Sequence, residues 1–478
     1  MEPSSLLDRF NNWVKESVII KLISIGILML ILMIPSAWVQ NVIRERQTRA
    51  DEVIKEVSGK WASNQTVTGP ILMIPYKHVE NVKEWAANGT SYTRIVETIH
   101  RAYFLPDDLT VNGTVAPEKL HRGIFDVAVY DSRLNIKSTF GDIKFDKWNI
   151  PDEQVMWNDA ELVLGVKDMQ GIYENPKISS GAATFTSEST ADIGMNISYY
   201  NTSVDYRGEQ LESATEEPTT GIVVSFNWKG REDLLKTFGI ELPLKGSERL
   251  YFVPAGKSTA VSISGSWPSP SFDGKMLPTT REVTDDGFKS TWKILAYNRA
   301  IADQWIDKEQ SLAGTEFGVR LLIPADQYQK SMRTAKYDAL IILLAFTALF
   351  LVEITRKVRI HPFQYILVGV ALSVYYTLLL SISEHTDYNT AYAISSAATV
   401  LLLAMYSITF LKTRPLVVLF SLVMSMFYVF IFVIIQAQDF SLLIGSVGLF
   451  LITAIVMYFS RNIRWYKDPD VINEVPPA

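Results

Sequence analysis

The chain has 478 residues, a formal net charge of −6 and no cysteine. The length allows more than one domain, and the negative charge gives no indication of a nucleic-acid partner. The lack of cysteine excludes disulfides, thiolate metal sites and a cysteine nucleophile. The composition is 48% hydrophobic, with a mean hydropathy of +0.12. This average conceals a polar, β-patterned middle between apolar ends.

Residues 18–43 form the first apolar stretch, which is long enough to cross about 30 Å of hydrocarbon as a helix. Because Pro35 stands where a cleavage site would follow, we expect a retained signal anchor rather than a removed signal peptide. Residues 1–17 are predicted to lie on the cytoplasmic membrane surface as an amphipathic helix. Their apolar side chains recur at helical spacing: Leu6, Leu7, Phe10, Trp13 and Val14.

Five further apolar stretches lie in the C-terminal third of the chain. The predicted spans are 338–355, 363–382, 391–411, 415–435 and 441–459. Lys and Arg cluster after the second, fourth and sixth spans, whereas the two intervening turns carry acids and no Lys or Arg. By the positive-inside rule the basic turns are cytoplasmic. Both termini, including the tail 460–478, are therefore predicted inside the cell, and residues 44–337 in the periplasm.

Two basic clusters lie on the side that this topology makes external. They contain Arg44, Arg46 and Arg49 after the first span, and Lys330, Arg333 and Lys336 before the second, where Tyr328 and Tyr337 are neighbours. One interpretation is solvated charge paired with nearby acids, such as Glu45 four residues before Arg49. The other is a collar that holds anionic lipid headgroups. We treat Arg44, Arg46, Arg333, Lys336 and the two tyrosines as candidate interface residues.

The external segment consists of short, β-branched and often alternating runs separated by Gly, Pro, Asn and Asp. This pattern predicts a mainly-β domain, a sandwich or a barrel. The run YFLPDDLTVNG (103–113) resembles YFVPAGKSTAVSISG (251–265), which raises the possibility of two related halves. After the second run, a loop carries Trp267 and Phe272. These aromatic residues either bind a partner or fold back onto their own domain.

The stretch SISEHTDY (381–388) places Glu384 and His385 at the external end of a span. His361 lies at the opposite end of that span, so the three cannot share a metal site. Glu384 and His385 alone supply too few ligands for zinc. The chain contains no H-E-x-x-H, P-loop, G-x-S-x-G or strand-linked G-x-G-x-x-G motif. We therefore predict no catalytic residues, no metal and no cofactor, and keep Glu384 and His385 as docking or binding candidates.

Several segments resemble the bacterial inner-membrane protein CreD family. They include VRLLIPADQYQKSMRTAKYDALIILLAF, RIHPFQYILVGVALSVYYTLLLSISEHT, RNIRWY, GPILMIP, RGIFDV and SWPSPSFDGKMLPTTREV. The sequence departs from the family's pattern at Asp387 and Arg464. The resemblance implies one N-terminal span, a large periplasmic region and a C-terminal bundle in the inner membrane. It also implies a role in cell-envelope integrity and envelope stress, without an established activity or cofactor.

These features together favour a non-enzymatic inner-membrane protein that supports the envelope through its periplasmic β domain. Its expected partners are membrane lipid and an envelope component or membrane protein. The alternative is a membrane enzyme or transporter for lipid or cell-wall intermediates, which a cavity lined by Glu384, His385, Arg333 and Lys336 would favour. A sensor is disfavoured, because the cytoplasmic turns and tails leave no room for an output domain.

Overall fold

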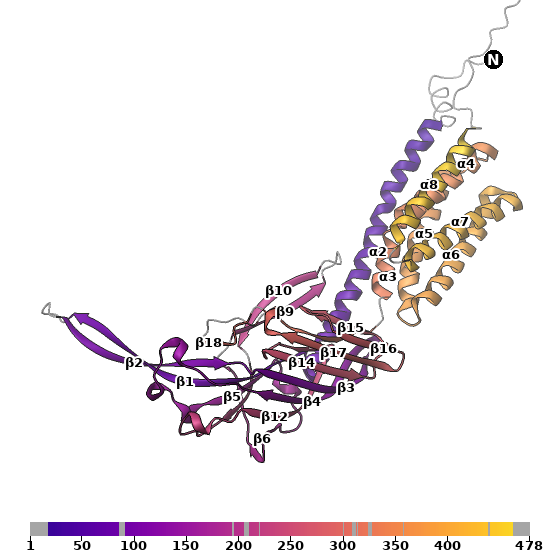
Figure 1. Cartoon of the computed structure of the whole chain (residues 1–478). Helices are drawn as coiled ribbons and strands as arrows, with labels where there is room; N and C mark the ends of the chain where they lie inside the picture. Colours follow the sequence, from indigo (N-terminus) through magenta and orange to yellow (C-terminus); the bar gives the residue numbers. More distant parts are fainter. Residues whose placement is uncertain are drawn as a thin grey trace, which may run out of the picture. The chain divides into compact units, whose positions relative to one another are not determined.

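The computed structural model describes most of the chain. The described residues are 18–85, 91–193, 196–204, 210–218, 220–299, 301–307, 312, 314–323, 327–356, 358–437 and 440–461. The predicted surface helix 1–17 and nearly all of the tail 460–478 lie outside them. The chain divides into two compact units, one formed by Met1–Arg49 with Ala325–Ala478 and the other by Ala50–Pro324. The first, which we call the membrane unit, is helical, and the second is the β domain (Figure 1).

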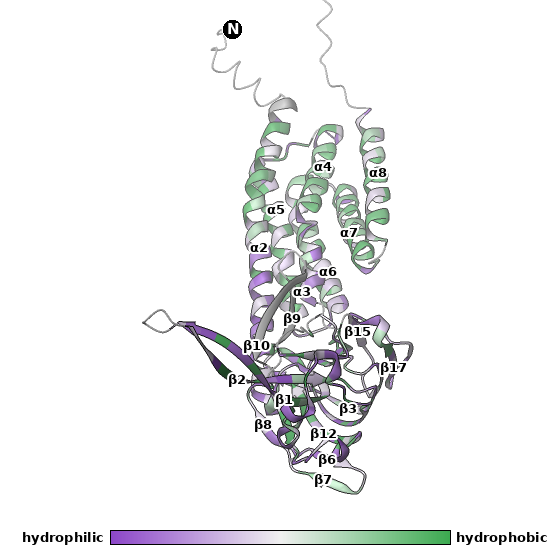
Figure 2. Ribbon diagram, turned by 60° about the vertical axis from the view of Figure 1, so that its left-hand side comes forward, coloured by the Kyte–Doolittle hydropathy of each residue, from purple (hydrophilic) through white to green (hydrophobic). Residues whose placement is uncertain are grey.

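Seven helices are described, and all except the short α3 are long and apolar enough to cross a membrane. Their bounds are α2 (Val18–Trp61), α3 (Gln327–Ala335), α4 (Asp338–Arg356), α5 (Pro362–Ser383), α6 (Tyr388–Leu411), α7 (Arg414–Gln436) and α8 (Ser441–Ser460). Figure 2 shows how strongly apolar residues dominate the long helices. The predicted fold class, six membrane-spanning helices plus a β domain, is confirmed.

Local sequence signals set where several of these helices begin. His361 caps α5, because its Nδ1 accepts a hydrogen bond from the amide of Phe363 at 3.2 Å and Pro362 follows in the first turn. Asp387 caps α6 by accepting from the amide of Thr390 at 3.0 Å. His361 and Glu384 lie at opposite ends of the 22-residue helix α5, as expected.

Small residues allow close packing between the helices. A Cβ atom added to Gly369 of α5 would lie 2.2 Å from Leu32 of α2, so the glycine lets these two helices approach. A Cβ atom added to Gly448 of α8 would lie 2.1 Å from the ring of Phe430 in α7. Gly445, one turn earlier, has more space, with its nearest neighbour at 3.9 Å. Helix packing therefore depends on some of the small residues and not on others.

Two large sheets and a small hairpin make up the β domain. The first sheet runs in the order β15-β19-β13-β1-β5-β11-β8, with β2 on β1 and β18 on β2. Its strands are β1 (Gln65–Trp85), β2 (Ser91–Phe104), β5 (Glu161–Val166), β8 (Glu188–Thr190), β11 (Gly221–Ser225), β13 (Arg249–Phe252), β15 (Pro270–Gly274), β18 (Gln304–Ile306) and β19 (Phe317–Leu321). At Gly69, with φ 98°, β1 shifts its register against β5, and glycine adopts this conformation at little cost.

The second sheet runs in the order β16-β17-β14-β3-β4-β12-β6-β7. Its strands are β3 (Asp108–Arg122), β4 (Phe125–Thr139), β6 (Lys177–Ser180), β7 (Ala183–Phe185), β12 (Thr237–Ser247), β14 (Ser258–Gly265), β16 (Thr280–Thr284) and β17 (Gly287–Leu295). The separate hairpin is β9 (Asn196–Val204) with β10 (Gln210–Pro218). Six short 3₁₀ turns also lie in the domain: Asp146–Trp148, Asp152–Gln154, Trp157–Asp159, Met169–Gly171, Arg231–Asp233 and Ala296–Asn298.

One apolar core joins the two sheets and makes the domain a sandwich. It contains Ile71 and Val163 from the first sheet together with Val111, Ile136 and Ile240 from the second. Strands of the second sheet alternate between buried and less buried residues, as expected when one face packs on a core. The first twelve residues of β1 are all buried, which makes β1 a central strand.

The two similar sequence runs occupy neighbouring places in this sandwich. β2 and β13, both of the first sheet, end at Phe104 and Phe252. After a Pro break, the chain in each case enters the second sheet, as β3 and as β14. There the two strands pair in parallel, with Val111 beside Val261. The two runs thus follow the same path between the sheets, although the rest of the two halves differs.

The aromatic residues of the predicted loop lie inside the domain. Trp267 is only 4% exposed, and its Nε1 donates a hydrogen bond to the carbonyl oxygen of Leu322 at 2.9 Å. Phe272 lies in β15 and packs edge-on against Phe288 and Trp292. Of the two interpretations left open by the sequence, these contacts favour folding back over an exposed partner-binding loop.

Candidate functional site

Glu384, at the end of α5, brings three helices of the membrane unit together. Its Oε1 lies 3.7 Å from Nε of Arg46 in α2 and accepts a hydrogen bond from the hydroxyl of Tyr328 in α3 at 3.5 Å. The Glu384 side chain is 12% exposed and that of Arg46 is 51% exposed. The structure therefore unites three of the predicted candidates, which lie far apart in the sequence. We call Arg46, Tyr328 and Glu384 the Glu384 cluster.

Burial and charge both act on the tyrosine of this cluster. Burial raises the pKa of Tyr328 to about 12, and the negative charge of Glu384 acts in the same direction. Tyr328 is consequently a neutral hydrogen-bond donor at physiological pH. A phenol with this pKa is not ionised near neutral pH. The arrangement therefore suits a hydrogen-bonded contact between helices better than acid–base chemistry.

The other candidates from the two basic clusters, and His385, do not join the Glu384 cluster. Arg333, Lys336 and His385 are exposed, and among the described residues their side chains form no ion pair or side-chain hydrogen bond. Tyr337 is partly buried. Arg44 donates a hydrogen bond to Asn41 within its own helix, at 2.9 Å. Of these basic residues, Arg46 contacts Glu384 of the bundle, whereas Arg333 and Lys336 are exposed.

At the other end of α5 a second contact was missed by the sequence reasoning. Nζ of Lys21 in α2 donates to Oε1 of Glu353 in α4 at 2.8 Å, and the hydroxyl of Tyr365 donates to Oε2 at 3.1 Å. Arg356, three residues after Glu353 in the sequence, is not its partner, because the Glu353 carboxylate is 4% exposed and points into the bundle, while Arg356 is exposed.

Asp338 is the first residue of α4, so it lies at the end of a span as the sequence indicates, but this end of the helix is buried. Its carboxyl is 1% exposed and lies 3.5 Å from the hydroxyl of Ser373, at the middle of α5. The reason is α3, which packs against α5, α6 and α7, so that α4 begins inside the bundle. The tyrosine-rich run SVYYTLLL (373–380) was the signal in the sequence that could have pointed to this polar interior.

The β domain carries a second unusual feature, a long two-stranded arm (Figure 1). Strand β1 continues past its buried half, and residues 77–85 pair only with residues 91–99 of β2 among the described strands. Because opposite residues of an antiparallel pair share a face, the register places four apolar side chains on one face. They are Val79 (41% exposed), Trp85 (75%), Ile95 (64%) and Ile99 (66%). We call this surface the arm face.

The base of the arm is fixed to the body of the domain. Nδ1 of His100 lies 2.7 Å from Oδ2 of Asp307, and its ring stacks on Tyr76 with centroids 5.7 Å apart. These contacts lie on the face opposite to the arm face, because His100 and Tyr76 are register partners in the even-numbered set. The arm is thus anchored from one side while its apolar face is exposed.

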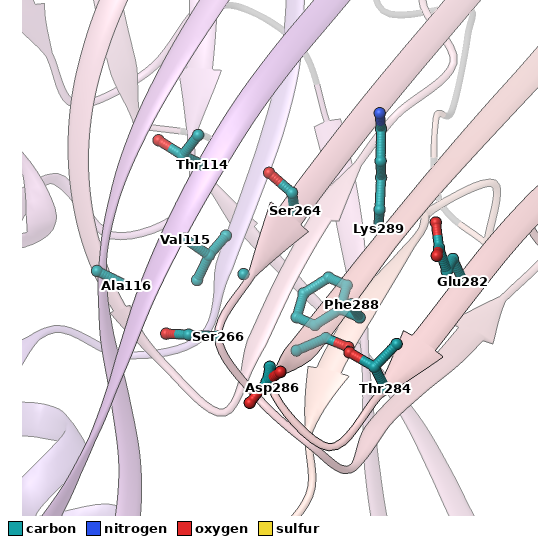
Figure 3. A pocket seen from close by; sticks show the side chains of 12 residues that line it. Thr114, Val115, Ala116, Ser264, Ser266, Glu282, Thr284, Asp286, Phe288 and Lys289 are labelled. Atoms are coloured by element: carbon teal, nitrogen blue, oxygen red, sulfur yellow. The ribbon is translucent and has the colours of Figure 1, made fainter.

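Two hollows are described, and neither is lined by Glu384, His385, Arg333 or Lys336. One, of about 510 Å³, is open and lies beside the middle of β3 and near the ends of β14, β16 and β17. Figure 3 shows Glu282, Asp286 and Lys289 at its rim, around the ring of Phe288. The other, of about 590 Å³, is a groove between α6 and α7 lined by Tyr392, Ser396, Ser425, Tyr428 and apolar residues.

Comparison with known proteins gives one consistent relationship. A family model described as "Inner membrane protein CreD" matches residues 17–466. The curated "Inner membrane protein CreD" of Escherichia coli (strain K12) is 29% identical over 458 residues, covering 95% of this chain and 94% of that protein.

Solved structures offer only weak likenesses. An M1 zinc metallopeptidase from Deinococcus radiodurans covers 40% of this chain and 38% of its own, at 11% identity and a TM-score of 0.16. A substrate-bound mutant of an M1 zinc metallopeptidase from the same organism covers 78% of this chain and 96% of its own, again at 11% identity and 0.16. Likenesses of this size carry no inference about this chain. Because the family model spans nearly the whole sequence, the chain belongs to the CreD family of inner membrane proteins.

Proposed function

We propose that this inner-membrane protein supports the cell envelope without catalysis, by binding an envelope protein through the arm face of its β domain. The observation that carries the proposal is the row Val79, Trp85, Ile95 and Ile99, exposed on one side of a rigidly based hairpin. Contiguous exposed apolar surface on a folded domain marks an interaction site more often than chance. Tryptophan, here Trp85, is among the residues most enriched in binding hot spots.

A protein partner fits the chemistry of the arm face better than a bilayer does. Polar residues of both signs alternate with the apolar ones: Lys77, Asn81, Lys83, Thr93 and Glu97 lie on the same face. Lys77 and Glu97 form an ion pair of 3.8 Å across the strands. Such a mixture of apolar side chains with charges of both signs resembles the composition of protein–protein interfaces, whereas an anionic lipid surface favours clustered positive charge.

The membrane topology supports a periplasmic location for the arm. The turns after α4 and α6 carry Arg356, Arg359, Lys412 and Arg414, while the α5–α6 turn carries Glu384 and Asp387. By the positive-inside rule the former are cytoplasmic, which places the β domain in the periplasm and both termini inside. Cysteine accessibility tests this topology in whole cells: a cysteine at Thr98 should react with a membrane-impermeant maleimide, and one at Thr413 should not.

Photo-crosslinking in the full-length protein tests the arm face. A photoreactive residue at Ile99 or Ile95 should cross-link a specific envelope protein, whereas one at Thr98, which is exposed on the reverse face, should not. Ile95→Asp with Ile99→Asp should reproduce the detergent sensitivity of a deletion strain, and Thr98→Asp should not. Cross-links to lipid alone, equal cross-links from both faces, or full complementation by the double variant would each contradict the proposal.

A second candidate function, handling of a lipid or cell-wall intermediate by the membrane unit, is favoured by the groove between α6 and α7. Its volume of about 590 Å³ and its apolar lining suit a single acyl or isoprenoid chain. Leu401 and Val429 on its rim are each 62% exposed, so the groove opens on a surface suited to lipid. Native mass spectrometry tests this function: Ala397→Phe, which fills the groove, should reduce lipid retention, and Leu442→Phe on exposed α8 should not.

A further inference from the structure

Asp338 is a carboxyl group buried at mid-depth in the membrane unit. It is 1% exposed and is the first residue of α4. Its Oδ2 lies 3.5 Å from the hydroxyl of Ser373, which is near the middle of the 22-residue helix α5. At 1.5 Å per residue, about 15 Å of helix separates Ser373 from either end. Ser36 of α2 is a further hydrogen-bond partner, so the carboxyl joins three helices.

No positive charge accompanies this carboxyl. Among the described residues, Asp338 forms no ion pair, and its Oδ1 has no hydrogen-bond partner. The basic residues closest in sequence, Arg333 and Lys336, have exposed side chains. A charged carboxylate in such surroundings costs several kcal/mol, and ionisable groups inside membrane bundles mark proton or ion sites by default. The group is therefore stable there when a proton or a cation neutralises it.

The surroundings of Asp338 are hydroxyl groups rather than charges. The phenols of Tyr376, in α5, and Tyr428, in α7, interact electrostatically with the carboxyl, and the Tyr376 oxygen has no hydrogen-bond partner among the described residues. The ring of Tyr375 lies 4.9 Å from that of Tyr376 and 4.7 Å from that of Tyr428. A buried hydroxyl without a partner destabilises the folded protein. The cluster thus retains polar groups that packing alone does not explain.

Further buried hydroxyls lie at the α5–α6 end of the bundle. The hydroxyls of Thr334 and Tyr388 are 2.6 Å apart, and Tyr388 interacts electrostatically with Tyr376. Nζ of Lys330 lies 5.7 Å from the centroid of the Tyr388 ring. Toward the other end of α5 the buried residues next to Ser373 are apolar, with Leu372 and Val368. The polar groups near Asp338 therefore extend toward the α5–α6 end.

We propose that Asp338 is an intramembrane proton-binding site that exchanges its proton with water at the α5–α6 end of the bundle. The proton binds the carboxylate and gives a neutral carboxylic acid that donates to a neighbouring hydroxyl. On release the proton passes to water at that end, and the carboxylate remains. A proton suits the site better than a metal ion, because no group of three or more His, Asp or Glu residues in the described part of the chain could hold a metal ion.

Infrared difference spectroscopy of the full-length protein tests the protonation state. The wild-type spectrum minus that of Asp338→Asn at pH 7 should contain the C=O stretch of a buried carboxylic acid, and the band should shift in D₂O. Asparagine keeps the shape of the side chain and the hydrogen bond from Ser373. Glu353→Gln removes a different buried carboxylate and should leave the band unchanged. A difference spectrum with only carboxylate bands at pH 7 would overturn the proposal.

A hydrophobic carbodiimide gives an independent readout, because it reacts with protonated carboxyl groups in apolar surroundings. Mass spectrometry should find the adduct on Asp338, with labelling that falls as pH rises and is lost in Asp338→Asn. Tyr376→Phe, which removes one hydroxyl that interacts with the carboxyl, should shift the pH midpoint of labelling. If millimolar Na⁺ protects Asp338 at constant pH, the site binds a metal cation and the proton proposal fails. Labelling that is independent of pH would also overturn it.

Discussion

Nζ of Lys21 in α2 lies 2.8 Å from Oε1 of Glu353 in α4, although 332 positions separate them in the chain. The lysine is 36% exposed and the glutamate 4%. The contact joins the first helix to the C-terminal bundle and is reinforced by Tyr365 on the other carboxylate oxygen. The helix before the β domain and those after it therefore form one unit.

Removal of this carboxylate should weaken the attachment of α2. We expect Glu353→Ala to destabilise the membrane unit by about 1–3 kcal/mol, because it leaves Lys21 and Tyr365 without their acceptor. The exchange Lys21→Glu with Glu353→Lys should recover part of the loss. Thermal unfolding of the purified protein in one detergent measures the effect. A Glu353→Ala variant as stable as the wild type would show that the contact is dispensable.

Packing of α2 on α5 depends on Gly369. Gly369→Ala should destabilise the membrane unit by about 1–3 kcal/mol, because the new methyl group would lie 2.2 Å from Leu32. Leu32→Ala in the same chain should relieve the overlap. Gly445→Ala is the matched control, since the nearest atom there is 3.9 Å away. Equal melting temperatures for the two single variants would contradict this account.

The two tryptophans considered for binding should differ sharply in their effect on stability. Trp267→Ala should cost about 3–5 kcal/mol, because the side chain is buried and its Nε1 donates to Leu322. Trp85→Ala, at a residue 75% exposed, should change stability by no more than about 0.5 kcal/mol. Hydrogen exchange of the β-domain amides in the full-length protein separates these cases. Comparable destabilisation by both substitutions would argue against the exposed arm face.

The β domain should lose stability through Glu316 as pH rises above the ordinary pKa of glutamate. Burial raises the pKa of this carboxyl, Oε1 lacks a partner, and Lys167 opposes the effect only in part. Below the ordinary pKa of glutamate both the folded and the unfolded chain are protonated, so the side chain imposes no penalty. As pH rises through the folded-state pKa, the folded chain must bury a charge. The free energy of unfolding of the β domain therefore falls as pH rises from the ordinary pKa of glutamate through the raised pKa of Glu316.

Glu316→Gln should therefore raise the stability of the β domain at pH 7 and leave it unchanged at pH 4. Hydrogen exchange at the amides of β19, next to Glu316, reports the difference in the full-length protein. Glu282→Gln at an exposed position of β16 is a suitable control. If Glu316→Gln destabilised the domain at pH 7, the carboxylate would have a favourable partner and the sign of this prediction would be wrong.

Much of the architecture was predictable because it depends on local patterns. The six spans follow from apolar length, since a helix must satisfy its backbone within the bilayer. The caps at His361 and Asp387 follow from residues whose side chains accept backbone hydrogen bonds within three positions. The β-rich middle follows from alternation and from the spacing of its turns.

The polar interior of the membrane unit was not predictable in this way. A hydropathy pattern places Asp338 at the edge of a span, and only the packing of α3 among α5, α6 and α7 puts it near the middle of α5. Likewise, Glu353 has a basic residue three positions away in sequence, but its buried orientation selects Lys21 instead. The partner of a charged side chain depends on how deeply that side chain is buried and on the direction in which it points. The order of residues in the sequence contains neither property.

By itself, the sequence determined which segments span the membrane, where their helices begin, and that a β domain lies between the first and second spans. These properties depend on interactions within a few residues and on the cost of exposing polar backbone to lipid. The tertiary structure decided that Arg46, Tyr328 and Glu384 meet, that Trp267 is buried while Trp85 is exposed, and that β3 and β14 lie side by side. Such relationships arise from long-range packing, where the fit of whole surfaces determines which side chains become neighbours.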